Sequence, residues 1–457
     1  MKLTTHYTLK IGTKIGQCRA VPVRYRPDEP EGILALTCAD FDVDPFVEMF
    51  FFPDDTLKMT MIAGDGRIIW QRDLGRGVVP GMWFCPAFPF DLDRDGVEDI
   101  WYVTNSDPSH PLALSKYRLE RIDAATGEPT GQWPWPGHAD QRLSYAFRNF
   151  VFGGYASGTP TLVTAQGTYG SMYLQGHRVG PSGDPEPAWE TVVATDAPGA
   201  RGSHMCPVVD INNDGDDEFF WGERCLRISD GSELFCADRD SYRGHSDIIA
   251  PVLDWRTGSW SFYTCRESDG TAAPRVAHYD AAGNRLWGVL DAGHIDMGWV
   301  ASRDGTGSRL AMATRIGAKT CGPDGREHTN LEEFFYDLST GAPRQTRLNA
   351  YKTLPVDLNG DGIHELVRGA PGGTGEVLDL EGNRLGSVGG AVAVATRVID
   401  RPGEHLLSYH DDGTIALWYD ADAVDCDHAK DRYAHPYYQS ARKLTATGSN
   451  LVNLGGM

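Results

Sequence analysis

The chain has 457 residues and a formal net charge of −21 at pH 7. Nucleic acids and anionic membranes are bound through basic surfaces, so the acidity argues against both as partners. Hydrophobic residues make up 41% and charged residues 23% of the sequence, a composition that excludes an intrinsically disordered protein. The 53 glycines and 27 prolines indicate many turns.

The N-terminal segment, MKLTTHYTLKIGTKIG, contains no apolar run of signal-peptide length, and the chain has no stretch of about 18 apolar residues. As written, the sequence predicts a cytoplasmic protein; removal of a signal would make it extracellular or periplasmic. The nine cysteines form no CxxC pair, which agrees with a reducing compartment. Residues 5–12 are a candidate strand for closing a ring against the last repeat.

A module recurs along the chain: an apolar strand, an Asp-rich or Gly-rich turn, and a second strand. Most copies are followed by a further strand pair around a hairpin signal such as DG, TG or GN. Four strands in each repeat of roughly 40–65 residues are typical of propeller blades. The eight copies begin at Ala20, Pro86, Ala146, His204, Asp247, Asp296, Lys352 and Ala391.

The repeats predict an all-β fold: a β-propeller of four-stranded antiparallel blades, with eight blades favoured and seven as the alternative. We expect one domain over residues 1–457, whose irregular tail, residues 421–457, packs on the propeller. A β-sandwich fits less well, because it has about seven strands in about 100 residues. A monomer is expected.

Three of the turns share one spacing of side chains that carry oxygen, with Gly at the sixth position. Oxygen ligands at alternate positions can wrap a hard cation, and the glycine permits the sharp reversal. The alternative is a solvated acidic turn held by side-chain-to-backbone hydrogen bonds. Three copies at equivalent places favour structural Ca²⁺. The expected ligands are Asp91, Asp93, Asp95 and Asp99; Asp210, Asn212, Asp214 and Glu218; and Asp357, Asn359, Asp361 and Glu365.

Around these turns the sequence resembles polysaccharide lyases. ARGSHMCPVVDINNDGDDEFFWG from Ala200, YRGHSDIIAPVLD from Tyr242 and PVDLNGDGIHELVRG from Pro355 are similar to the core of the rhamnogalacturonan lyases, which have an eight-bladed, calcium-rich propeller. DLDRDGVEDIWYVTN from Asp91 resembles instead the seven-bladed ulvan lyases and related enzymes that act on rhamnose–glucuronate linkages. The ulvan-type enzymes tend to carry a His just before this strand, but residues 81–85 contain none.

The resemblance implies a lyase that cleaves a rhamnose/uronate linkage of an anionic plant or algal polysaccharide or oligosaccharide by β-elimination. Ca²⁺ is the expected cofactor, structural at the turns and, as a further option, catalytic. Polar residues also recur where the innermost strand of a blade would begin, at the rim of the central channel. They are Tyr145 and Arg148; Arg201 and His204; Arg243, His245 and Asp247; His294 and Asp296; and Tyr351 and Lys352.

Removal of the proton α to a uronate carboxylate requires that the carboxylate be neutralised and that a base lie nearby. For any one His of the rim, the alternative is a strand-end cap or a ligand of a channel water; His294 and Asp296 could instead hold a cation. The catalytic candidates are Arg148 and Arg201 for neutralisation, His204 and His245 and then Lys352 as the base, Tyr169 as a proton donor or sugar platform, and His110, which the ulvan-type resemblance adds.

Two further site hypotheses are weaker. Cys206, Cys225 and Cys236 could hold zinc with a His, although their spacing matches no standard finger. A sugar platform could be formed by Trp83, Trp221, Trp255 and Trp299.

Two other functions stay open. One is a rhamnosidase-like glycoside hydrolase, which normally needs two carboxylates about 5–10 Å apart. The predicted rim contains few Glu residues, which favours the lyase. The other is a glycan-binding propeller without activity, for which no convergent cationic cluster is expected at the rim.

Overall fold

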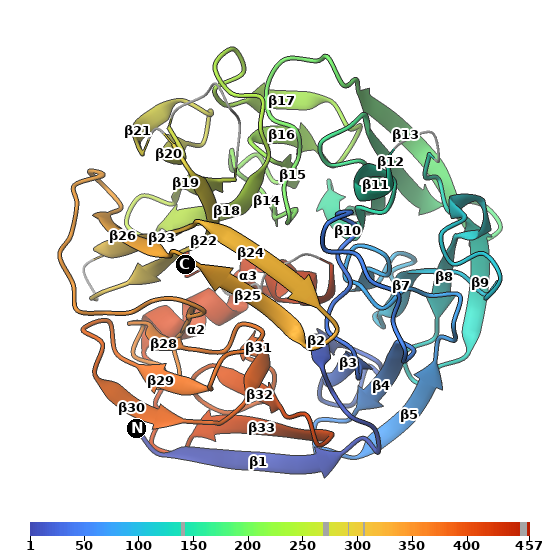
Figure 1. The fold of residues 1–457 in the computed structure, drawn as a ribbon, viewed down its shortest axis with the longest axis horizontal. Coiled ribbons are helices and arrows are strands. Elements are labelled where there is room, and N and C mark those ends of the chain that lie inside the picture. The colour runs from blue at the N-terminus through green and yellow to red at the C-terminus, as the bar shows by residue number, and fades with distance from the viewer. Residues whose placement is uncertain (139–141, 268–273, 291, 305–306, 448–454) are drawn as a thin grey trace.

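The computed structural model describes residues 1–138, 142–267, 274–290, 292–304, 307–447 and 455–457. Eight antiparallel sheets stand in a ring around a central channel (Figure 1). The predicted β-propeller with eight blades is confirmed, and the seven-bladed alternative is excluded. Among the described residues, no helix has the length and apolar character needed to cross a membrane.

The first four blades are regular four-stranded sheets in chain order. Blade one has β2 (Gln17–Val23), β3 (Gly32–Cys38), β4 (Lys58–Ile62) and β5 (Ile68–Asp73). Blade two has β6 (Ala87–Phe90), β7 (Asp99–Thr104), β8 (Arg118–Ile122) and β9 (Pro129–Pro134). Blade three has β10 (Asn149–Ala156), β11 (Thr159–Gln166), β12 (Met172–Val179) and β13 (Pro185–Val193). Blade four has β14 (Val208–Val209), β15 (Glu218–Trp221), β16 (Arg224–Arg227) and β17 (Glu233–Cys236).

The other blades include two special cases, the sixth and the eighth. Blade five has β18 (Ser246–Asp254), β19 (Ser259–Arg266), β20 (Val276–Asp280) and β21 (Arg285–Val289). Blade six has β22 (His294–Ser302), β23 (Arg309–Ile316) and β26 (Glu332–Asp337), interrupted by the hairpin of β24 (Ala318–Gly322) and β25 (Gly325–Thr329). Blade seven has β27 (Leu354–Val356), β28 (Glu365–Val367), β29 (Glu376–Leu378) and β30 (Arg384–Ser387). Blade eight has β31 (Ala391–Thr396), β32 (His405–Tyr409), β33 (Thr414–Asp420) and β1 (Leu3–Lys10).

The N-terminal strand closes the ring. β1 pairs with β33 from Leu3 opposite Asp420 to Lys10 opposite Thr414, so the first strand of the chain becomes the outermost strand of the last blade. The predicted closing strand is therefore confirmed. The closure leaves no open edge between the first and last blades.

Blade six departs from the four-stranded pattern that we predicted. Its sheet has three strands among the described residues, and only an isolated bridge between Tyr336 and Pro343 extends it outward. A proline has no N–H to donate, so it cannot continue a ladder. The β24–β25 hairpin is inserted between β23 and β26 and lies over the channel (Figure 1).

Burial follows the position of a strand within its blade. Every residue of β2 and β3 is buried, whereas the outer strand β5 is partly exposed along its length. Inner strands are covered on both faces by the neighbouring blades, so they are mostly apolar and do not alternate between apolar and polar residues. The core thus consists of apolar layers between adjacent blades, with Trp101, Phe150 and Trp221 fully buried in the layers of blades two to four.

The three Asp-rich turns adopt one backbone conformation. Each joins the first and second strands of its blade, and its sixth position is a glycine with positive φ: Gly96, Gly215 and Gly362. The fourth position also has positive φ, at Arg94 (64°), Asn213 (58°) and Gly360 (77°). The spacing that the three turns share in sequence therefore corresponds to a backbone conformation that they share in the structure.

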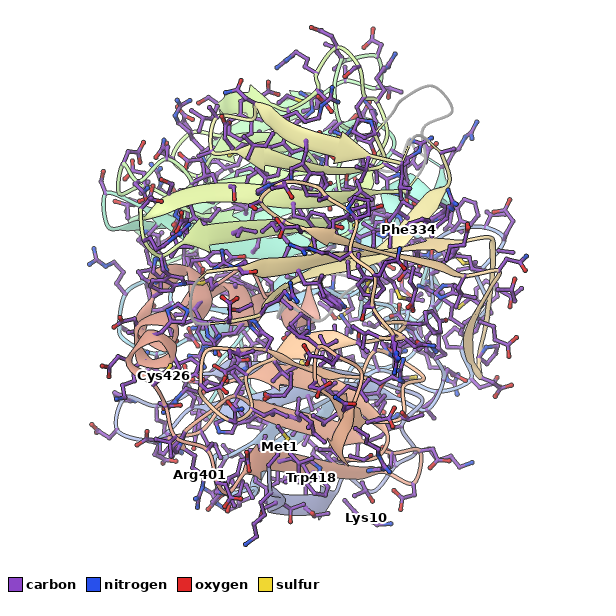
Figure 2. The ribbon with its side chains drawn as sticks, turned by 90° about the vertical axis from the view of Figure 1, so that its left-hand side faces the viewer. Met1, Lys10, Phe334, Arg401, Trp418 and Cys426 are labelled. Atoms are coloured by element: carbon purple, nitrogen blue, oxygen red, sulfur yellow. The ribbon has the colours of Figure 1, made fainter. Side chains whose placement is uncertain are left out.

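The C-terminal segment is helical, so the expectation of an irregular tail is wrong. It contains α2 (Asp427–Ala434), α3 (Pro436–Ala441) and the 3₁₀-helix η2 (Arg442–Ala446); shorter helices elsewhere are η1 (Leu114–Lys116) and α1 (Leu143–Ala146). Proline at the first position of α3 suits a helix start, because that N–H has no partner inside the helix. The edge-on view of the ring in Figure 2 shows α2, beside Cys426, at one side of the molecule.

The tail covers the channel on the face of the Asp-rich turns. Thr447 donates a hydrogen bond to the carbonyl of Val151, and the Arg432 guanidinium contacts Asp357 at 2.7 Å. Figure 1 places α2 and α3 behind the ring and the β24–β25 hairpin in front of it. We call these two sides the turn face and the cavity face.

Candidate active site

A cavity of about 670 Å³ lies at the channel mouth on the cavity face. It is lined by residues at the starts of β10, β18, β22 and β27, the innermost strands of four blades, and by the β24–β25 hairpin. Because innermost strands converge on the channel, residues far apart in sequence meet there.

Most of the predicted catalytic residues lie in this cavity, although their roles stay predictions. One does not: His110 is exposed in the β7–β8 connection and is absent from the described lining residues. The candidates that line the cavity are Arg148, Tyr169, Arg201, His204, His245 and Lys352.

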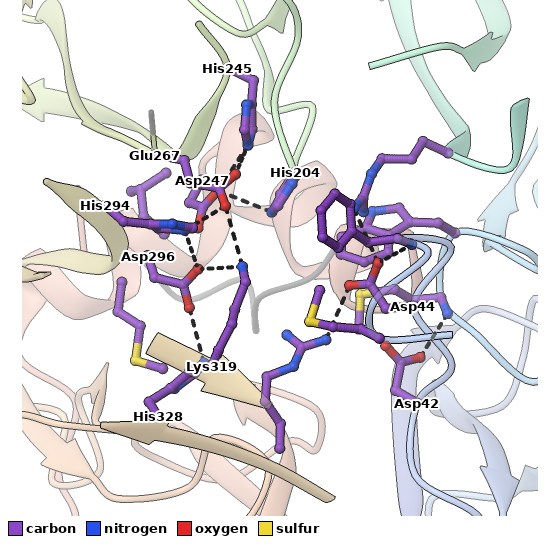
Figure 3. A pocket seen from close by; sticks show the side chains of 18 of the residues that line it. Asp42, Asp44, His204, His245, Asp247, Glu267, His294, Asp296, Lys319 and His328 are labelled. Atoms are coloured by element: carbon purple, nitrogen blue, oxygen red, sulfur yellow. Dashed lines mark hydrogen bonds and ion pairs between the residues drawn. The ribbon is translucent and has the colours of Figure 1, made fainter. Parts of the chain in front are cut away.

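Two histidines contact the carboxylates of an acidic cluster (Figure 3). His204 Nδ1 lies 3.1 Å from Asp247 Oδ1, and its Nε2 lies 3.0 Å from the Tyr169 hydroxyl. His245 Nε2 contacts Glu267 and lies 3.8 Å from Asp247. Asp247 thus faces both imidazoles at once.

The cluster continues into blade six and the hairpin. His294 Nε2 lies 2.5 Å from Glu267 and 3.1 Å from Asp296. The ammonium group of Lys319, on β24, lies 3.3 Å from a carboxylate oxygen of each of these two acids. His328, on β25, lies 3.4 Å from Asp296.

Two sets of these side chains could hold a metal ion, since their ligand atoms lie within 4.8 Å of one another. Three carboxylates face the Lys319 ammonium group and the His294 imidazole, and a divalent cation bound here would take the place of the protons that such crowding favours. The first set is His204, His245, Asp247 and Glu267; the second is Asp247, His294 and Asp296.

Burial and charge shift the protonation of the cluster. Burial lowers the pKa of His245 to about 4. Burial and the adjacent carboxylates of Glu267 and Asp296 raise the pKa of Asp247 well above its usual value. Burial alone would also raise the pKa of Glu267, but the charges of His245 and Lys319 and a hydrogen bond from His294 hold it well below its usual range. One carboxyl group therefore favours a proton, which is expected where like charges crowd.

A second charged group lies across the cavity (Figure 3). The Asp44 carboxylate, in the β3–β4 loop, accepts a hydrogen bond from Arg148 at 3.2 Å. It accepts a second one from Arg326, on β25, at 3.3 Å. Arg148 is 2% exposed, and its Nε and Nη1 have no hydrogen-bond partner among the described residues. Its guanidinium also lies 3.9 Å from the ring centre of Trp83. Two donors of a buried cation thus stay available to an anion.

Arg201 is held differently. Its guanidinium donates to the backbone carbonyls of Ala194, Tyr169 and Gly170. These bonds fix the loop that carries Tyr169, so the geometry favours a supporting role for Arg201 over direct neutralisation of a substrate.

Tyr169 and Lys352 share an uncommon backbone conformation. Their φ angles are 80° and 61°, in the left-handed region that non-glycine residues rarely adopt. Such strain of about 1–3 kcal/mol persists only where the surroundings impose it, and it clusters at functional sites. Burial raises the pKa of Tyr169 well above its usual value and lowers that of Lys352.

The four tryptophans predicted to form a sugar platform lie in different parts of the molecule. Trp83 and Trp299 line the cavity, whereas Trp221 is fully buried in the core between blades. Trp255 contacts the rings of His428 and His435 of the tail region, on the turn face. Trp83 and Trp299 are themselves only 1% exposed, so burial argues against the predicted sugar platform for them as well.

The proposed zinc ligands do not form one of the metal-capable groups found among the described residues. All nine cysteines are free, and Cys206 and Cys225 are buried. The Asp-rich turns fit a cation better: the ligand oxygens of Asp91, Asp93 and Asp95 lie within 4.8 Å of one another.

Carboxylates also lie close together in the second and third Asp-rich turns. Burial, together with the neighbouring aspartates, raises the pKa of Glu218 and of Glu365 to about 8. Glu218 Oε1 is buried without a hydrogen-bond partner among the described residues. In the first turn, Asp99 lies 3.7 Å from Arg121, and burial raises its pKa to about 7. These carboxylates suit a cation, and calcium remains a proposal.

Sequence reasoning missed half of the charged lining. The rim predicted from the sequence contains few Glu residues, and Glu267 is the one glutamate among the described lining residues; the other carboxylates of the lining are Asp42, Asp44, Asp247 and Asp296. Asp42, Asp44 and Glu267 follow the second strands of their blades, which the rim pattern did not cover. Lys319, Arg326 and His328 lie in an insertion that matches no repeat, and this mismatch was the signal that could have identified them.

No protein-family model matches the chain. A rhamnogalacturonan exolyase, YesX, of Bacillus subtilis strain 168 is 25% identical over 277 residues, which cover 52% of this chain and 43% of that protein. The match spans less than half the length of that relative.

Solved structures match over almost the whole chain. The exotype rhamnogalacturonan lyase YesX superposes with a TM-score of 0.76 at 18% identity, covering 96% of this chain and 78% of that one. The Bacillus licheniformis rhamnogalacturonan lyase PL11 gives 0.76 at 17% identity, covering 98% and 81%. The resemblance to the rhamnogalacturonan lyases that the motifs predicted is therefore confirmed in sequence similarity and in fold.

Proposed function

We propose that this protein is a polysaccharide lyase that cleaves a rhamnose/uronate linkage, as in rhamnogalacturonan, by β-elimination. The observation that carries the proposal is the pairing in one cavity of a metal-capable cluster with a buried arginine that has free donors. β-Elimination needs both positive charge for the uronate carboxylate and groups that move protons. The sequence similarity to a rhamnogalacturonan exolyase supports the same reading.

Arg148 is the proposed neutralising group. Its Nη2 is bound by Asp44, which fixes the plane of the guanidinium, while Nε and Nη1 stay free among the described residues. Nε and Nη1 point to different sides of a guanidinium, so either can donate one charge-assisted hydrogen bond to a carboxylate. Such a hydrogen bond would favour the enolate-like intermediate, in which negative charge accumulates on those oxygens.

We infer that His204, His245, Asp247 and Glu267 hold a divalent cation. Their mixture of imidazole nitrogens and carboxylate oxygens is compatible with Ca²⁺ or with a transition metal such as Mn²⁺ or Zn²⁺. A cation there would supply a second positive charge to the substrate carboxylate. In this assignment His204 and His245 are ligands, and the base must be sought elsewhere.

Lys352 and Tyr169 are the proposed proton-transfer groups. Lys352 lines the cavity, and burial lowers its pKa, so its neutral form, which can act as a base, is easier to populate. The Tyr169 hydroxyl is directed at His204 and lies near the Arg148 guanidinium, 5.1 Å from the tyrosine ring centre. It is placed to return a proton to the leaving oxygen.

The test is product chemistry. The protein is incubated with rhamnogalacturonan, ulvan and gum-type glycans in water labelled with heavy oxygen, and products are followed by ultraviolet absorbance and mass spectrometry. A lyase gives a new unsaturated uronate without solvent oxygen. Incorporation of label without unsaturation would instead identify a hydrolase, for which the five carboxylates of the cavity provide candidates.

Substitutions test the proposed role of Arg148. Arg148→Lys keeps the charge but loses the planar guanidinium that Asp44 and Trp83 hold in place, so it should raise KM and lower kcat. His177→Ala is a matched control, since His177 is a buried histidine of blade three that lies outside the described cavity lining. It should alter stability and leave the reaction class and KM unchanged.

A further inference from the structure

The acidic cluster has two halves, which are its two metal-capable sets, and the Glu267 carboxylate faces both. Its Oε2 contacts His245 Nε2, a member of the first set. Its Oε1 lies 2.5 Å from His294 Nε2, a member of the second set. Asp247 belongs to both sets. Two-metal sites hold their ions about 3.5–4 Å apart, a spacing at which one carboxylate can reach both. The cluster therefore has the side chains of a two-metal site.

A lysine lies in the second half of this cluster. The ammonium group of Lys319 reaches in from β24 (Figure 3), 3.3 Å from Glu267 Oε1 and 3.3 Å from Asp296 Oδ1. His294 Nε2 lies 2.5 and 3.1 Å from the same two oxygens. An ammonium group has three donors and no acceptor, so it competes with a metal ion for these oxygens and cannot bind one. An ion held by His294 and Asp296 would stand beside a group of like charge.

The charges of the cluster balance with one divalent ion. Asp247, Glu267 and Asp296 carry three negative charges when they are ionised, and all three residues are buried. With the imidazoles neutral, the Lys319 ammonium supplies one positive charge and one divalent cation supplies two. A second divalent cation would leave an excess of positive charge, and unpaired charge is costly in a buried site.

We propose that the Lys319 ammonium takes the place of a second metal ion, so that one divalent cation binds in the set of His204, His245, Asp247 and Glu267. This inference rests on the metal assignment in the proposed function. It adds the number of ions and gives the hairpin a role in the site. A tethered ammonium group cannot dissociate, so one positive charge stays in the cluster when the metal ion is removed.

The main test is Lys319→Met, which removes the charge and keeps an unbranched side chain. The probe is Mn²⁺, followed by electron paramagnetic resonance and by equilibrium dialysis. Nitrogen couplings identify an ion bound by histidine, because the Asp-rich turns offer side-chain oxygens. Spin coupling identifies two neighbouring ions. Wild type should show a histidine-bound ion without a coupled pair. Lys319→Met should show a coupled pair and bind one more Mn²⁺ per chain.

Two further variants serve as controls. Arg326 lies on the same hairpin and lines the cavity, but it pairs with Asp44. Arg326→Met should therefore leave the single histidine-bound ion and give no pair. Asp296 is outside the first set, so Asp296→Asn should also keep that ion. This second control does not depend on whether Lys319→Met folds.

A coupled pair in the wild type or in Arg326→Met overturns the proposal, and so does a folded Lys319→Met protein without one. Loss of the histidine-bound ion from Asp296→Asn, or its absence from the wild type, overturns it as well. Lyase activity is judged separately by the unsaturated products, so failure of the proposed reaction is distinguishable from failure of this inference.

Discussion

The two faces of the propeller carry charged clusters that are assembled in different ways. On the turn face, Asp91 to Asp99 belong to one turn. On the cavity face, Asp44 meets Arg148 across 104 positions of sequence and Arg326 across 282. Clusters of the first kind tie two strands of a blade together, and those of the second kind bring different blades to one point. Stability and chemistry should therefore respond to different substitutions.

A second contrast lies within the turn face. In the first turn, Asp91 accepts the N–H groups of Asp95 and Gly96, as expected for a local turn. In the third turn, Asp357 additionally receives Arg432 of α2, and both side chains are almost completely buried. The tail thus supplies a buried positive charge to the first aspartate of the third turn, whereas in the first turn Arg121 lies 3.7 Å from Asp99 and not beside Asp91. A cation should contribute less to the third turn.

The largest expected effect separates the faces. His204→Ala should lower kcat by about 10²–10⁴, a range typical for loss of one catalytic group, and should lower the bound metal measured by elemental analysis. His204 is buried and contacts Asp247, Tyr169 and Trp83, so the melting temperature should also fall, and activity is compared at a temperature at which both proteins are folded. Unchanged activity, or loss of activity only through unfolding, would place His204 outside the site.

Arg432→Met should lower the stability of the protein and leave its activity unchanged. It removes the positive charge from buried Asp357 and Glu404, and breaking a buried ion pair costs about 3–5 kcal/mol in the free energy of unfolding. Specific activity of the folded fraction should remain. Chemical denaturation provides the measurement.

The matched control for Arg432→Met is Lys430→Met on the same helix. The ion pair of Lys430 with Asp427 is exposed, so its loss should cost about 1 kcal/mol or less. Equal costs of the two substitutions would contradict the importance of the Arg432 contact.

Chelation should lower the melting temperature, and calcium should restore it. A ligand present at about one hundred times its Kd stabilises by about 2.7 kcal/mol per site. Asp93→Ala should remove more of the calcium-dependent shift than Asn359→Ala, because Asp357 of the third turn already pairs with Arg432. Calorimetry with and without chelator decides; a melting curve that chelation does not move rejects calcium at the turns.

The smallest expected effect is a displaced pH profile. Lys352 must lose its proton to act as a base, so kcat/KM should rise with pH through the pKa of its ammonium group. Burial lowers that pKa below its usual value of 10.5, so this limb should lie below pH 10.5. Lys352→Arg should abolish the limb, since a guanidinium keeps its proton. A limb at or above the usual lysine value contradicts the assignment.

The sequence by itself determined the propeller, its eight blades, the closing strand and the shared conformation of the Asp-rich turns. These features depend on periodicity and on spacing within a few residues, which local sequence encodes directly. It also indicated most of the rim, because the innermost strands of successive blades start at one place in the repeat.

Only the tertiary structure decided which charges meet. Lys319, Arg326 and His328 reach the cavity because an insertion folds back over the channel, and the repeat pattern contains no signal for its direction. Arg201 fits a carboxylate clamp by spacing, yet its donors are used by nearby carbonyls. Arg432 joins the third turn only because the tail forms a helix there. Side-chain partners across blades depend on packing of the whole ring, which no local spacing determines.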